Sequence, residues 1–182
     1  MALPALNTGV FTLEDAAREV LIADLAAACA EVGALVANFA ITSAHARNIQ
    51  LTDGRIPGQG QEHIGISSAP IASEPGVMGT RIETRLLVIR CAHIEQRLTT
   101  TGGALKAATL ENESWRICNA LSKACEIALL RRSGLLSSDS IFNANSRGPQ
   151  RVAQDPARPA VFAVDLLIEV NMRVYDPVYM TI

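Results

Sequence analysis

The three histidines of the chain, His45, His63 and His93, are the side chains best suited to acid–base chemistry or to metal binding. His63 directly follows Glu62, and His93 lies two residues before Glu95, so an acid and a base come close in sequence at these two places. No histidine stands three or four residues from another ligating side chain in a recognisable zinc pattern. We therefore interpret His63 and His93 as surface residues at the ends of strands.

Nucleophile and phosphate-binding motifs are also missing from the sequence. No serine lies in a G-x-S-x-G motif, and the glycine-rich run Gly54–Gly60 lacks the lysine followed by serine or threonine of a phosphate loop. The four cysteines have no C-x-x-C spacing and no adjacent histidine, which indicates buried thiols in a reducing compartment; they are Cys29, Cys91, Cys118 and Cys125. The sequence thus predicts a protein that is not an enzyme, without catalytic residues, cofactor or metal.

The composition excludes further classes of function. The 182 residues suffice for one domain with a proper core, and the net charge of −2 provides no basic field for sequence-specific binding of nucleic acid. No signal peptide begins the chain, and no apolar stretch reaches the roughly 18 residues that span a membrane. We expect a single soluble domain over residues 1–182 in the cytoplasm, with residues 1–11 as a flexible tail.

A long amphipathic segment, Ala160–Tyr175, must organise the fold. Its even positions are apolar without a break, whereas most odd positions from Asp165 onward are polar. Because successive side chains of a strand point to opposite faces, this segment predicts one long strand with a dry face and a wet face. The buried face should contain Leu166, Ile168 and Val170.

Two helices are predicted to cover that dry face. Leu13–Val32 has apolar residues at helical spacing, with Thr12 as N-cap and Asp15 in the capping-box position. A second helix begins at Ala104 or at Glu111 and ends at Arg132, before Gly134.

The remaining segments predict strands and loops. Glycine and proline residues predict exposed loops at 48–61 and 69–80. Strands are expected at 61–68, at Thr80–His93 and around Ile141 and Phe142, the last followed by a polar turn at Asn145–Gly148. This order predicts an α+β fold in which two main helices pack on one face of a largely antiparallel sheet.

This order of elements resembles the tail terminator, or tail completion, proteins of long-tailed bacteriophages. The segments that carry the resemblance are the helices Leu13–Val32 and Glu113–Arg132, the central strand Glu83–Cys91 and the closing strand Phe162–Val174. The resemblance implies a homohexameric ring that caps the tail tube, stops its polymerisation and provides the surface that joins the head. It also implies the tail tube protein and head–tail connector or stopper proteins as partners, and a place in the virion neck after assembly in the host cytoplasm.

Two alternatives remain open from the sequence. One is another head–tail connector or stopper protein of the neck. The other is a small α+β ligand-binding protein or enzyme with a pocket between the sheet and the helices.

A ring needs complementary surfaces on each subunit, and charged residues provide candidates for them. The polar face of the closing strand carries Asp165, Glu169 and Arg173, which have both signs of charge. Arg81, Arg85 and Arg90 lie on the central strand and offer complementary cations. We predict that these six residues form the subunit interface.

Overall fold

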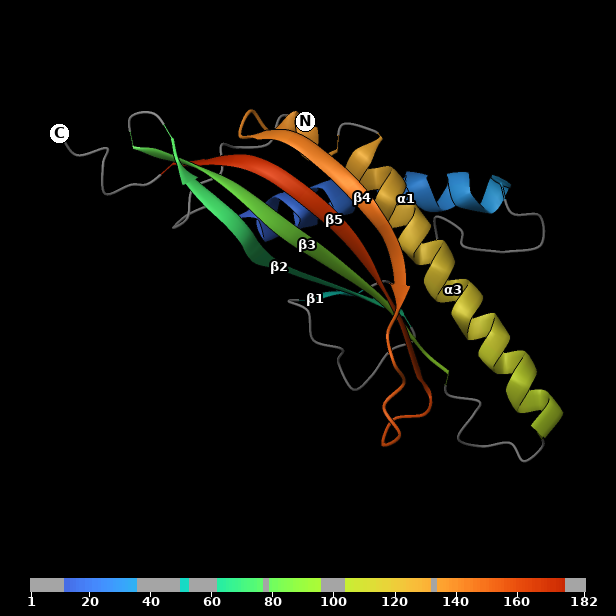
Figure 1. Cartoon of the computed structure of the whole chain (residues 1–182). Helices are drawn as coiled ribbons and strands as arrows, with labels where there is room; N and C mark the ends of the chain where they lie inside the picture. The colour runs from blue at the N-terminus through green and yellow to red at the C-terminus, as the bar shows by residue number, and fades with distance from the viewer. Residues whose placement is uncertain are drawn as a thin grey trace.

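In the part of the chain that it describes, the computed structural model contains a strongly twisted sheet and two long helices (Figure 1). It describes residues 12–35, 50–52, 62–76, 79–95, 104–131 and 134–175. The helices are α1 (Leu13–Leu35) and α3 (Ala104–Leu130), and a short 3-10 helix η2 (Leu135–Ser137) follows α3. No helix in the described part is long and apolar enough to cross a membrane.

The described residues contain five strands, which form one sheet in the order β1-β2-β3-β5-β4. Their bounds are β1 (Gln50–Thr52), β2 (Glu62–Pro75), β3 (Thr80–Ile94), β4 (Ile141–Arg151) and β5 (Val161–Tyr175). All neighbouring strands run antiparallel except β1 and β2, which pair in parallel over three residues. The predicted long closing strand is therefore confirmed as β5, in the interior of the sheet between β3 and β4.

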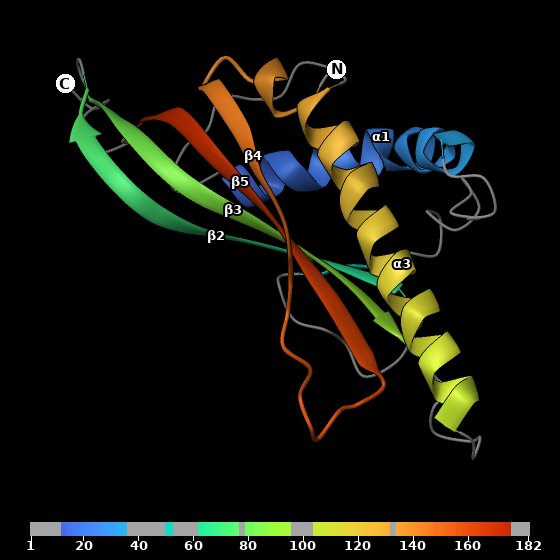
Figure 2. The ribbon, with the colours of Figure 1, turned by 45° about the vertical axis from the view of Figure 1, so that its right-hand side comes forward.

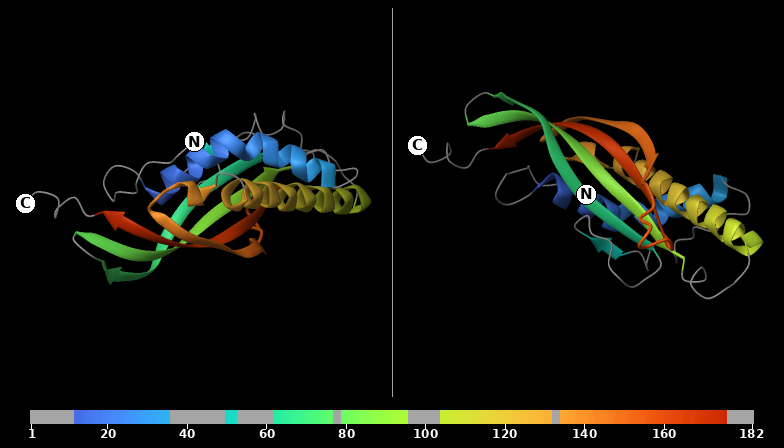
Figure 3. Two further views of the ribbon diagram at one scale, coloured as in Figure 1. Left: turned by 90° about the horizontal axis from the view of Figure 1, so that it is seen from above. Right: turned by 60° about the horizontal axis from the view of Figure 1, so that its bottom comes forward.

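Both helices lie on the same side of the sheet, as Figure 3 shows from above. The seven even positions of β5 from Phe162 to Val174 are buried, and most odd positions are partly exposed. At the start of α1, the N–H of Asp15 donates to Thr12 Oγ1 at 3.2 Å, and the N–H of Thr12 donates to Asp15 Oδ2 at 2.9 Å. This capping box fixes where the helix begins.

Because two helices pack on one face of a largely antiparallel sheet, the predicted α+β architecture is confirmed.

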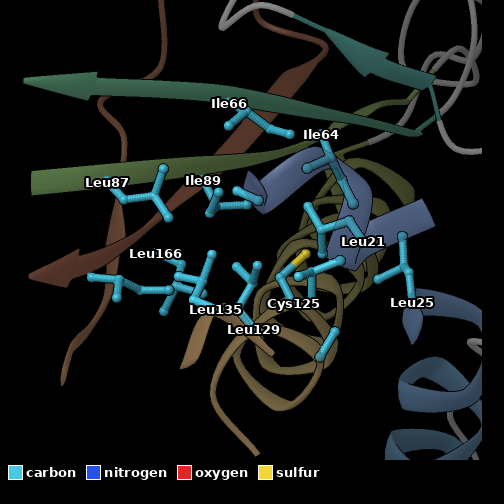
Figure 4. Close-up of a cluster of buried hydrophobic side chains, with 14 of the residues drawn as sticks. Leu21, Leu25, Ile64, Ile66, Leu87, Ile89, Cys125, Leu129, Leu135 and Leu166 are labelled. Carbon is cyan, nitrogen blue, oxygen red and sulfur yellow. The ribbon is translucent and has the colours of Figure 1, made fainter. Parts of the chain in front are cut away.

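The main hydrophobic core fills the space between the helices and the sheet (Figure 4). Leu166, Ile168 and Val170 are at most 1% exposed, as the alternation of β5 predicts. Side chains of α1, α3, β2, β3 and η2 converge on the same cluster; those labelled in the figure include Leu21, Leu25, Ile64, Ile66, Leu87, Ile89, Cys125, Leu129 and Leu135.

Two predicted loops are wrong in their boundaries. Most of the loop expected at 69–80 is strand, because β2 continues to Pro75 and pairs with β3 beyond a bulge between Pro70 and Ala72. Among the described residues, only the short β1 pairs along the other side of β2, so the second half of β2 tolerates its prolines, which cannot donate to a ladder. The loop expected at 48–61 contains β1, and its other residues, like the tail 1–11, lie outside the described residues.

The polar turn expected at Asn145–Gly148 is also wrong. These residues belong to β4, and the register against β5 shifts between Ser146 and Gly148. Gly148 has a φ of 86°, in the left-handed region that glycine enters without a steric penalty. Glycine therefore marks a β-bulge here, not the end of the strand.

Candidate functional site

The pairing of β3 with β5 places Arg90 and Asp165 directly opposite each other, on the face of the sheet away from the helices. The guanidinium of Arg90 donates from Nε to Asp165 Oδ1 at 2.8 Å and from Nη2 to Oδ2 at 2.7 Å. The hydrogen bond to Asp165 raises the pKa of Arg90. This bidentate ion pair lies within one subunit, so the two charges, which the sequence offered as candidates for complementary surfaces, already satisfy each other.

Glu169 is satisfied within the subunit in the same way. Its carboxylate accepts a hydrogen bond from Arg147 of the neighbouring strand β4. Arg173 lies on the same outer face, near the end of β5, in one row with Ile82 of β3 and Glu74 of β2. Of the three candidates on β5, only Arg173 is exposed and forms no ion pair with a described residue.

Arg81 and Arg85 lie on the opposite face of β3, the face toward the helices. Both contact the buried carboxylate of Glu83, each at 3.2 Å. Arg85 also donates from Nε to Ser68 Oγ at 3.0 Å, and this hydroxyl donates to Glu14 of α1 at 2.6 Å. These contacts tie the start of α1 to β2 and β3. The six predicted interface residues therefore form two groups on opposite faces of the sheet.

A histidine lies between two glutamates at the other end of β3. His93 Nδ1 is 3.2 Å from Glu62 Oε1, and His93 Nε2 is 3.6 Å from Glu95 Oε2. All three residues are buried, as is His63, so the prediction that His63 and His93 are surface residues is wrong. The sequence places Glu95 two residues after His93, but it gives no sign that Glu62 contacts His93, because the pairing of β2 with β3 brings these two residues together.

The thiols are buried, as predicted, and are poorly suited to nucleophilic chemistry. Burial raises the pKa of Cys118 to about 12, and burial together with the neighbouring Cys125 raises the pKa of Cys29 to about 12. Cys91 Sγ lies 3.9 Å from Cys125 Sγ, and this contact, with burial, raises the pKa of Cys91 as well. Because the thiolate is the reactive form, such thiols are inert near neutral pH.

A cavity of about 160 Å³ lies beside Arg90, at the connection between β4 and β5. Its lining consists of Arg90, Val152, Ala153, Asp155, Arg158, Val161 and Ala163. This position differs from the pocket between sheet and helices that a ligand-binding protein of this fold would use. In the described part of the chain, that space holds the apolar side chains of the main core.

Five large apolar side chains are exposed among the described residues. Ile22 lies on α1, and the other four are Ile71, Ile82, Leu136 and Phe142. Ile82 is opposite Arg173, and Ile141, the residue before Phe142, is opposite Met172, so both exposed residues lie at the end of the sheet where β5 finishes. Nothing in the sequence marks these side chains as exposed, although Phe142 is a large apolar residue in an expected strand.

Comparisons with known proteins give no further assignment. No protein-family model matches the chain, and no curated protein matches it. Among the described residues, no group of three or more histidine, cysteine, aspartate or glutamate side chains could hold a metal ion.

Proposed function

We propose that this chain is a structural subunit of a bacteriophage neck that assembles into a homohexameric ring. In this proposal the ring caps the tail tube, stops its polymerisation and provides the surface that joins the head, as the resemblance to tail terminator proteins implies. The subunit would assemble in the host cytoplasm and remain in the virion. The observation that supports this most directly is the second half of β2.

This half of β2 contributes almost nothing to the core of its own subunit. Residues 69–75 are exposed on both faces of the strand, although they pair with β3. Figure 2 shows that the end of β2 and the start of β3 reach beyond both helices. Ordering a residue costs about 1–2 kcal/mol in backbone entropy, and here no apolar burial offsets it. An extension of this kind is typical of a surface that a neighbouring protein covers.

The edges of the sheet favour a closed assembly over an open fibre. The β2 edge carries Pro70 and Pro75 and a bulge, and the β4 edge carries Pro149 and two register shifts. Prolines and bulges hinder the addition of further strands to a sheet edge. A subunit that ends the growth of a tube benefits from edges that do not template more strands.

A stopper or connector of the neck remains the nearest alternative, because it would use the same kind of ring. The ligand-binding or enzyme alternative has less support, since apolar side chains fill the space between the sheet and the helices.

Sedimentation velocity and electron microscopy of the purified chain test the proposal. We expect closed rings at low ionic strength, and we expect added rings to halt the growth of tail tubes assembled from the tube protein. Binding to the portal side of the neck, without any effect on tube growth, would favour the connector alternative. A monomer under every condition, including in the presence of tubes, would refute the proposed function.

A further inference from the structure

Three exposed side chains form a row across the sheet at the end where β5 finishes. The strand pairing places Glu74 of β2 opposite Ile82 of β3, and Ile82 opposite Arg173 of β5, so all three lie on the face away from the helices. Neighbouring strands are about 4.8 Å apart, so the two charges flank the isoleucine within about 10 Å. Neither charge forms an ion pair with a described residue. From β2 to β5 the row is therefore acidic, apolar and basic.

The cavity at the connection between β4 and β5 has matching groups. Its volume of about 160 Å³ is many times the roughly 10–15 Å³ that one water molecule needs, so an aliphatic side chain fits in it. Asp155 and Arg158 line the cavity and are exposed, and no described residue forms an ion pair with either of them. The apolar part of the lining consists of Val152, Ala153, Val161 and Ala163.

A turn holds these two charges beside the cavity. The N–H of Arg158 donates to the carbonyl of Asp155 at 2.8 Å, and the N–H of Ala157 donates to Asp155 Oδ1 at 2.9 Å. Arg90 also lines the cavity, but its guanidinium is already paired with Asp165. The cavity therefore offers one further cation and one further anion next to apolar side chains.

The row and the cavity are too far apart to meet within one subunit. Arg173 lies near the end of β5, whereas Val161 and Ala163 lie at its start. At about 3.3 Å per residue, the strand separates the two sites by roughly 30–40 Å. Figure 1 shows the end of β5 and the β4–β5 connection at opposite ends of the sheet. A contact between the two sites must therefore join two molecules.

We propose that the row of Glu74, Ile82 and Arg173 of one copy docks on the cavity of the next copy, a contact that rests on the proposed ring. Ile82 enters the cavity, Glu74 pairs with Arg158, and Arg173 pairs with Asp155. Ile82 is 37% exposed in the isolated subunit, so its insertion removes apolar area from water. Because the row and the cavity differ, the contact is heterologous and repeats head to tail around an axis.

A mixing experiment with two charge reversals tests this contact. Glu74→Arg brings two cations together at every contact, and Arg158→Glu brings two anions together. Each variant alone should therefore assemble about tenfold or more weakly than the wild type. In a 1:1 mixture each variant supplies the charge that the other needs, so rings of alternating copies should form. Mixing would not repair a folding defect in either variant.

Matched controls reverse exposed charges outside both sites. Glu19→Arg and Arg18→Glu make the same two changes on α1, where both side chains are exposed, and should leave assembly intact. At the apolar position, Ile82→Arg should prevent assembly, whereas the conservative Ile82→Val should preserve it. Sedimentation velocity measures the assembly of each variant, and circular dichroism shows whether it keeps its fold. The two Ile82 variants decide the question if a charge reversal unfolds the chain.

The possible results separate this contact from the proposed ring. If the wild type forms rings and either folded charge reversal assembles equally well, or if the two reversals fail to pair when mixed, the contact is refuted while the ring stands. If the wild type forms a closed dimer that each reversal dissociates and their mixture restores, the contact stands and the proposed ring fails. If the wild type remains monomeric, with or without tail tubes, both proposals fail.

Discussion

Ile168 lies at the centre of the helix-facing side of β5, and its side chain is fully buried in the main core. Truncation to alanine removes buried methyl and methylene groups and leaves a cavity that the surrounding side chains fill only partly. We expect Ile168→Ala to lower the free energy of unfolding by about 2–5 kcal/mol.

Urea unfolding measures this change, with Ile71→Ala as the control. Ile71 is 52% exposed, so its truncation should change the free energy of unfolding by less than about 0.5 kcal/mol. A loss below that value for Ile168→Ala would show that this face of β5 does not form the core.

The buried thiols predict a loss of stability in alkali. The pKa of Cys118 is raised to about 12 in the folded protein, whereas in the unfolded chain the thiol titrates near its ordinary value. Above about pH 9 the unfolded state therefore binds fewer protons than the folded state. The free energy of unfolding should fall as the pH rises from about 9 towards 12, by about 1.4 kcal/mol per pH unit for this thiol.

Unfolding of the wild type and of Cys118→Ala between pH 8 and 11 checks this prediction. Lysine and tyrosine residues titrate in both proteins, so the difference in slope isolates the thiol. The variant should show the shallower dependence on pH, and equal slopes would contradict the prediction.

At the scale of the element, β2 divides into two halves with different environments. Residues 62–66 are buried and pack beside β1 and the core, whereas residues 69–75 are exposed on both faces. Local opening needs little free energy where few apolar contacts are lost. In the isolated subunit, the amides of 69–75 should therefore exchange with solvent much faster than those of 62–66 and of β5.

Hydrogen exchange followed by mass spectrometry measures this contrast. Assembly with partner proteins should slow the exchange of 69–75, if a neighbour covers this extension as proposed. Equal protection of the two halves in the isolated subunit would show that the extension is stable by itself.

At the scale of the whole molecule, the two faces of the sheet have different roles. The helices and the main core cover one face, and the other carries the ion pairs Arg90–Asp165 and Arg147–Glu169. The charges of both pairs are already satisfied within the subunit. Surfaces for assembly are better sought where apolar side chains remain exposed, as at Ile22, Ile71 and Phe142.

The sequence by itself determined the elements whose signal is local. The alternation over β5 predicts its buried face, and Thr12 with Asp15 predicts the start of α1, because periodicity and capping depend on residues a few positions apart. The α+β class follows from the order of these elements.

The tertiary structure decided whatever depends on strand pairing. Arg90 and Asp165 are 75 residues apart in sequence, and Glu62 and His93 are 31 apart, so only the register brings each pair into contact. The same holds for residues 69–75, whose prolines and small side chains resemble a loop. Pairing with β3 makes them a strand, because ladder hydrogen bonds come from the partner strand and leave no local pattern in the sequence.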